Sequence, residues 1–69
     1  MITLKINPKK WYAVYFDPDY CGVEAYIYQG NQLMDAIEDY MNEHNGIYVA
    51  ELGNVFEAVK NEIQFKLYK

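Results

Sequence analysis

The segment WYAVYFDPDYCGVEAYIYQ, residues 11–29, carries the strongest structural signal in the chain. Aromatic and β-branched residues dominate its first and last seven positions, and such residues are favoured in strands. Between these two runs lies DPDYCG, residues 17–22, where proline and glycine favour a turn. The segment therefore predicts a β-hairpin with strands over residues 11–17 and 23–29.

Alternation along the two strands predicts the faces of this hairpin. The more aliphatic side chains are expected to face the helices, and they are Tyr12, Val14, Phe16, Val23, Ala25 and Ile27. The opposite face then presents four aromatic residues and two acids, which are Trp11, Tyr15, Tyr26, Tyr28, Asp17 and Glu24. Exposed tyrosine and tryptophan side chains are typical of protein interfaces. Two alternatives are cross-strand pairing that merely stabilises the hairpin and base stacking, which the carboxylates on this face disfavour.

Before the hairpin, residues 2–6 alternate between apolar and polar side chains, which predicts a half-buried strand. After it, Gly30 and Asn31 are expected to open a helix with Asn31 as the N-cap. Apolar residues at helical spacing give this helix one buried face, and Asn45 with Gly46 provides its stop.

The rest of the chain predicts one more strand and a second helix. Residues 47–51 form the strand, and Gly53 with Asn54 opens a helix that runs to about Glu62. Residues 63–69 fit both a strand, because apolar residues alternate, and a continuing helix, because Val59, Ile63 and Leu67 are four apart. We favour the strand.

Together these elements predict a single compact α+β domain over residues 1–69. It has a small antiparallel sheet of three to five strands, two helices packed on one face and the approximate order βββαβα(β). A core this small makes a homodimer or a permanent partner an open alternative.

Composition excludes several classes of protein. The single cysteine argues against a disulfide framework and a cysteine-based zinc site. No apolar run approaches the roughly 18–20 residues of a membrane span, and the first residues lack a signal-peptide pattern. A net charge of −4 disfavours direct nucleic-acid binding. We expect a cytoplasmic protein without a membrane association.

No motif indicates catalysis, a metal ion or a cofactor. Asp17, Asp19 and Gly22 match the start of a calcium loop, but Cys21 and Tyr28 stand where two further ligands belong, so a turn is the better interpretation. Cys21 and His44 could form a nucleophile and its base, yet no local signature flanks either. The sequence therefore predicts a non-enzymatic protein with no cofactor and no metal.

Charge is strongly segregated along the chain. Residues 11–59 hold nine of the ten acidic residues and no lysine. Four of these acids, Asp35, Glu38, Asp39 and Glu43, line one side of the first predicted helix with no basic residue within four positions to pair with them. They predict an acidic partner-binding surface, to which Asp17, Asp19 and Glu24 would add. A solvated helix face that serves solubility is the alternative.

Small size, many tyrosines and the acidic run Asp35, Glu38, Asp39 and Glu43 resemble the small phage-encoded inhibitors of the anti-CRISPR and antirestriction type, several of which are DNA mimics. The resemblance is compositional and spans the whole chain without a shared motif. It implies a cytoplasmic protein in a bacterial host, whose partner is a protein with a basic nucleic-acid-binding groove. The expected function is to inhibit a CRISPR effector or restriction enzyme by blocking that groove. The alternative is a structural or regulatory adaptor that self-associates through its aromatic sheet face.

Overall fold

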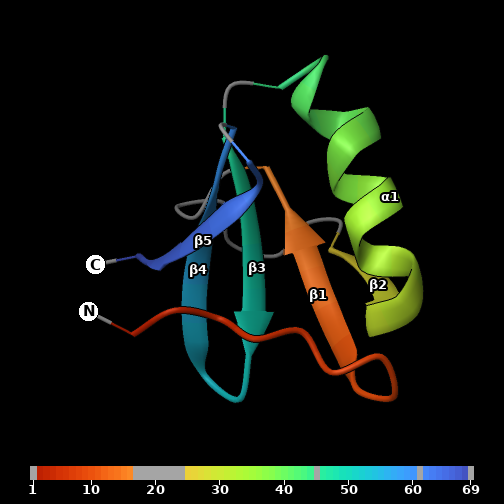
Figure 1. Cartoon of the computed structure of the whole chain (residues 1–69), viewed down its shortest axis with the longest axis vertical. Coiled ribbons are helices and arrows are strands. Elements are labelled where there is room, and N and C mark those ends of the chain that lie inside the picture. The colour runs from red at the N-terminus through yellow and green to blue at the C-terminus, as the bar shows by residue number, and fades with distance from the viewer. Residues whose placement is uncertain (1, 17–24, 45, 61, 69) are drawn as a thin grey trace.

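Five short runs rich in aromatic and β-branched residues pair into one antiparallel sheet, and one helix packs against it (Figure 1). The computed structural model describes residues 2–16, 25–44, 46–60 and 62–68. Helix α1 spans Gly30–Met41. The strands, in the sheet order β2-β1-β3-β4-β5, are β1 (Trp11–Tyr15), β2 (Tyr26–Gln29), β3 (Ile47–Glu51), β4 (Asn54–Val59) and β5 (Gln64–Leu67).

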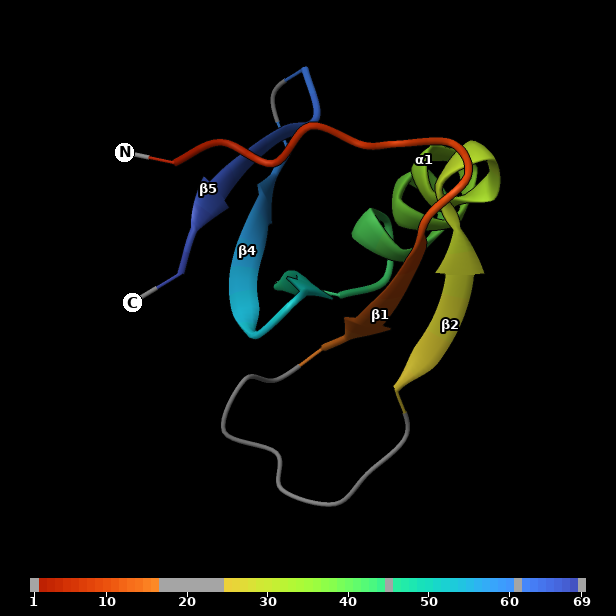
Figure 2. The same ribbon diagram turned by 90° about the horizontal axis from the view of Figure 1, so that it is seen from below.

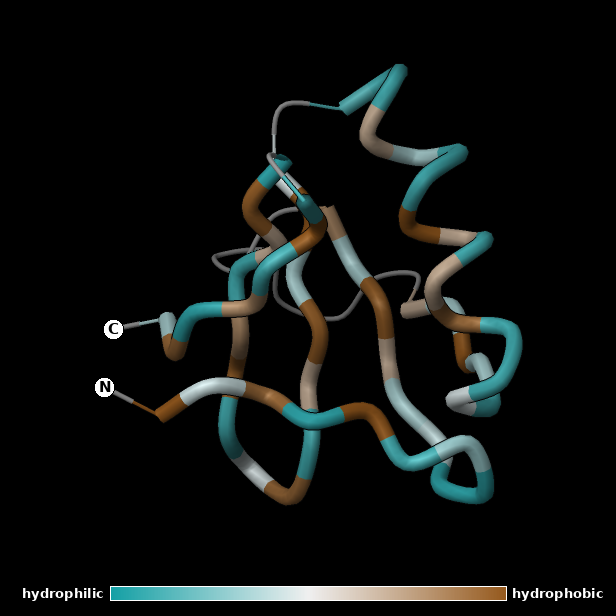
Figure 3. The backbone as a smooth tube through the Cα atoms, in the orientation of Figure 1, coloured by the Kyte–Doolittle hydropathy of each residue, from teal (hydrophilic) through white to brown (hydrophobic). Residues whose placement is uncertain are grey.

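The sheet is curved, and α1 and the N-terminal segment lie on its concave side (Figure 2). We call this side the inner face and the convex side the outer face. The inner face holds the core, to which the sheet contributes Tyr12, Val14, Ile47, Val49, Phe56, Ala58 and Phe65. Leu33 and Ile37 of α1 and Leu4 of the N-terminal segment complete it. Figure 3 shows hydrophobic residues recurring along the strands and along one side of α1.

The predicted α+β fold with two helices is wrong, because the described chain is sheet-dominated and has a single helix. The segment expected to form the second helix is β4, which pairs with β3 on one side and β5 on the other. Leu52 and Gly53 form the two-residue turn before it, with φ angles of 48° and 86°. Two positive φ angles are typical of the tight turn that joins hairpin strands. Gly53 is therefore the second residue of a hairpin turn between β3 and β4, and it does not begin a helix.

The predicted strand over residues 2–6 is also wrong. These residues are not paired with any strand of the sheet. The alternation did report burial, since Leu4 is 6% exposed and Ile6 is half-buried, while Ile2 is 57% exposed. The apolar period of two thus agreed with the burial of Leu4 and Ile6 but not of Ile2, and it did not establish that the backbone has a partner.

Helix α1 forms in the predicted segment but begins two residues earlier than expected, because its N-cap is Gln29 and not Asn31. Gln29 makes no side-chain capping bond. The start is instead determined by packing: the Gly30 N–H donates to the Lys10 carbonyl at 2.9 Å, and a Cβ at Gly30 would overlap the Asn7 carbonyl. A side chain here would force the backbone apart, so glycine is required by close approach.

Strands β1 and β2 pair antiparallel as predicted but are shorter than expected, and the predicted turn over residues 17–22 lies outside the described residues. Strand β3 spans residues 47–51 as predicted, and β5 confirms the strand interpretation of the C-terminal segment. Helix α1 buries Leu33 and Ile37 as its periodicity predicted. It ends at Met41, a few residues before Gly46.

Candidate interaction surfaces

Four exposed carboxylates lie along α1 and the turn that follows it. Asp35, Glu38, Asp39 and Glu43 are all exposed, whereas the helix buries Gly30, Leu33 and Ile37. Glu43 lies just past Met41, and its N–H donates to the Tyr40 carbonyl at 3.0 Å. We call these four residues the acidic ridge. The remaining predicted acids, Asp17, Asp19 and Glu24, lie outside the described residues.

Among the described residues, no ion pair involves the acidic ridge. Within the described residues, the ion pair found joins Lys10 and Glu51, whose Nζ and Oε1 atoms are 3.8 Å apart, away from the ridge. No basic residue stands in the last turn of α1, where a cation would complement the helix dipole. The ridge therefore combines like charges at three- and four-residue spacing without local compensation, which costs a few tenths of a kcal/mol per pair.

The four aromatic residues predicted to share one face do not do so. Tyr28 pairs with Tyr12 and Tyr26 with Val14, and directly paired residues point to the same side of a sheet. Tyr26 and Tyr28 therefore lie on the inner face. Trp11 and Tyr15 lie on the outer face, together with Ile27, which the sequence had assigned to the helix side.

The inner aromatic residues form a cluster with the C-terminal part of α1. The Tyr28 and Tyr40 hydroxyls are hydrogen-bonded at 2.6 Å, and the Tyr26 and Tyr40 rings stack with centroids 6.1 Å apart. His44 stacks on Phe16 at 3.9 Å. The hydrogen bond with Tyr40, followed by burial, raises the pKa of Tyr28 to about 12. These contacts bind α1 to the β1–β2 hairpin, so the predicted partner-binding residues Tyr26 and Tyr28 also have a structural role.

The outer face carries its own aromatic row. The Tyr15 and Tyr48 rings stack at 5.9 Å, and Tyr68 meets Tyr48 edge-on at 5.1 Å. Burial, followed by the neighbouring tyrosines, raises the pKa of Tyr15. Trp11 and Ile27 are 63% and 59% exposed on this side. Sequence reasoning missed Tyr48, Tyr68 and Ile27, although alternation within residues 47–51 already separated Tyr48 from the buried Ile47 and Val49.

Within residues 2–16, 25–44, 46–60 and 62–68, no group of three or more potential metal ligands is found. Cys21 lies outside these residues, so the structure does not place it relative to His44. In the same part of the chain, no helix combines the length and hydropathy that crossing a membrane requires. Comparisons with protein-family models, curated proteins and solved structures found no match.

Proposed function

We propose that this protein is a non-enzymatic inhibitor whose acidic ridge occupies the basic nucleic-acid groove of a bacterial defence complex, such as a CRISPR effector or a restriction enzyme. The proposal rests on the acidic ridge. Its four exposed carboxylates lie along α1 and the turn after it, and none has an ion-pair partner among the described residues. Such an arrangement costs the isolated protein stability, and a cationic partner would reverse that cost.

The dimensions of the ridge support this role. At about 1.5 Å per helical residue, Asp35, the pair Glu38 and Asp39, and Glu43 follow one another at steps of roughly 4.5–6 Å. Phosphates along one DNA strand are about 3.4 Å apart along the axis. A lysine- or arginine-lined groove shaped for nucleic acid would therefore meet a row of negative charges, spaced somewhat more widely than the phosphates of one strand. Charge attraction would also steer the two proteins together and make the association salt-sensitive.

The test compares two double substitutions that change the net charge equally. Glu38→Gln with Asp39→Asn alters the ridge, and Glu57→Gln with Glu62→Gln alters exposed acids elsewhere. The assay is DNA cleavage by a panel of purified CRISPR effectors and restriction enzymes, titrated with each protein. We expect the wild type to inhibit at least one of them and the ridge variant to need at least about tenfold more protein, which corresponds to about 1.4 kcal/mol.

The control variant should inhibit like the wild type, and raised salt should weaken inhibition. An equal loss in both variants would mean that net charge matters and the ridge does not. No inhibition across the panel would refute the proposal.

A second candidate function is self-association through the outer face. Trp11 and Ile27 favour it, because both are more than half exposed on the same side of the sheet. Apolar and aromatic side chains gathered in this way are typical of protein interfaces.

A further inference from the structure

Residues 2–6 form an extended segment that belongs to no strand of the described sheet. The segment lies over the inner face of the sheet, near the turn between β3 and β4 (Figure 1). Its N–H and C=O groups make no hydrogen bond with any described residue. Leu4 in its centre is only 6% exposed. Thr3 and Lys5 on either side of Leu4 are exposed. Unpaired backbone groups of an extended, exposed segment are a template for pairing with another strand.

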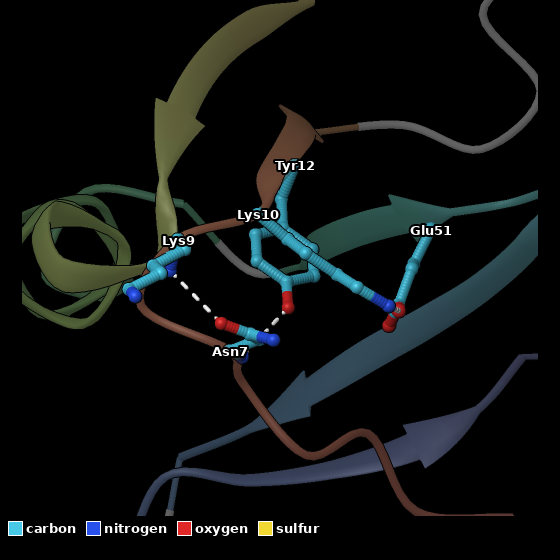
Figure 4. A network of polar contacts seen from close by, with 5 residues as sticks. All are labelled: Asn7, Lys9, Lys10, Tyr12 and Glu51. Carbon is cyan, nitrogen blue, oxygen red and sulfur yellow. Dashed lines mark hydrogen bonds and ion pairs between the residues drawn. The ribbon is translucent and has the colours of Figure 1, made fainter.

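The end of this segment is held firmly. The Asn7 N–H donates to the Tyr12 hydroxyl at 2.8 Å, and the Asn7 side chain accepts from the Lys9 N–H at 2.9 Å (Figure 4). Lys10 reaches Glu51 on β3 at 3.8 Å. With Leu4 in the core and Asn7 fixed on β1, the segment is preorganised in an extended form, which lowers the entropic cost of binding.

A hollow of about 320 Å³ lies between this segment and the β3–β4 turn. Ile2, Leu4, Leu52 and Phe56 contribute apolar surface to it, and Lys5 and Glu51 contribute charge. The hollow is open to solvent and has room for an apolar side chain. The exposed Lys5 beside it can form an ion pair with a carboxylate.

Leu52 is an unusual residue for its position. It has a φ of 48° and is 90% exposed. Tight hairpin turns of this kind prefer asparagine or aspartate, since positive φ is unfavourable for a bulky side chain. Leu52 therefore makes the turn less stable than asparagine would, and its side chain adds apolar surface to the edge of the hollow.

We propose that residues 2–6 bind an extended segment of a partner protein as an added β-strand, with an apolar side chain in the hollow and an acidic residue next to Lys5. Main-chain hydrogen bonds would supply affinity, and the hollow would supply specificity, as in other strand-addition complexes. The partner segment would therefore alternate apolar and acidic residues. This site is separate from the acidic ridge and does not depend on it.

The experiment selects binders from a displayed library of random heptapeptides and synthesises the strongest one. We expect the selected peptides to alternate apolar and acidic residues, and amide chemical shifts to change at residues 2–6 and Leu52 on binding. Hydrogen exchange at residues 3–6 should be fast in the free protein and slower in the complex. Methylating the backbone nitrogens of the peptide should weaken binding at least about tenfold, or about 1.4 kcal/mol.

Two matched variants separate binding from folding. Leu52→Asn should raise the melting temperature, because asparagine suits the turn, and should weaken peptide binding at least about tenfold. Ile27→Asn removes an exposed apolar side chain on the outer face and should leave binding unchanged, as should the ridge variant.

Four outcomes would overturn the proposal. They are a selection without alternating binders, a peptide that binds elsewhere, amides of residues 3–6 that are already protected in the free protein, and unchanged affinity in Leu52→Asn or after backbone methylation.

Discussion

At the scale of single residues, the Tyr28–Tyr40 hydroxyl pair shows how one hydrogen bond couples two elements. The bond is 2.6 Å long and joins β2 to α1. It raises the pKa of Tyr28 from its ordinary value of 10.0 to about 12, because ionisation would remove a proton that the pair shares and create a charge in a partly buried place. The folded chain therefore holds this proton at a pH where the unfolded chain has lost it.

This difference predicts how stability depends on alkaline pH. The raised pKa contributes stability that is fully present below pH 10 and is lost as pH rises from about 10 to about 12. Tyr40→Phe should lower the pKa of Tyr28 towards its ordinary value and make this loss smaller. Urea unfolding at a series of alkaline pH values, with tyrosinate absorbance recorded in parallel, measures both effects. Tyr28→Phe should behave similarly, and an undiminished pH dependence in both variants would contradict the assignment.

At the scale of elements, β4 shows where a local pattern misleads. Val55, Phe56 and Val59 have helical spacing, yet the segment is a strand. An isolated helix of this length is marginal in water, whereas pairing with β3 and β5 satisfies the backbone on both edges. The Leu52–Gly53 turn was the sequence feature that could have predicted a hairpin between residues 47–51 and β4. It was not recognised because asparagine or aspartate, not leucine, usually precedes glycine in such a turn.

For residues 54–59, the observed strand β4 and the helix expected from the sequence differ in how they place Val55 and Phe56. In β4, Phe56 points inward and is 3% exposed, while Val55 lies half-buried on the outer face. Phe56→Ala should cost about 3–5 kcal/mol, a large part of the roughly 3–10 kcal/mol available to a chain of this size. Val55→Ala should cost only about 1 kcal/mol. Urea unfolding measures both free energies, and equal losses would contradict the strand, since a helix would place both residues on one apolar side.

At the scale of the whole molecule, the chain folds compactly, and its described helix and N-terminal segment both lie on one side of the sheet. Its radius of gyration is 10.9 Å, close to the value of about 11 Å for a folded chain of this length. Helix α1 and the N-terminal segment cover the inner face (Figure 2). The acidic ridge and the outer aromatic row consequently lie on different elements, and each can be altered without the other.

Self-association through the outer face can be tested directly. If it occurs, sedimentation velocity should show a mass that rises with protein concentration, and Trp11→Ser combined with Ile27→Ser should remain monomeric. Leu52→Asn removes an exposed apolar side chain away from this face and should associate like the wild type. A wild type that stays monomeric at every accessible concentration would exclude the second candidate function.

Local sequence patterns were sufficient for the β1–β2 hairpin, β3, the buried side of α1 and the exposure of the acidic ridge. These features depend on residues a few positions apart, whose alternation or helical spacing is unambiguous. The strand at β4, the unpaired state of residues 2–6 and the inward direction of Tyr26 and Tyr28 were not predictable in this way. They depend on which strands meet and in which register, and a one-residue change of register moves every side chain to the other face. The register is determined by strands that are far apart in the sequence. Only one register of all five strands together places the apolar side chains on the buried face of the sheet.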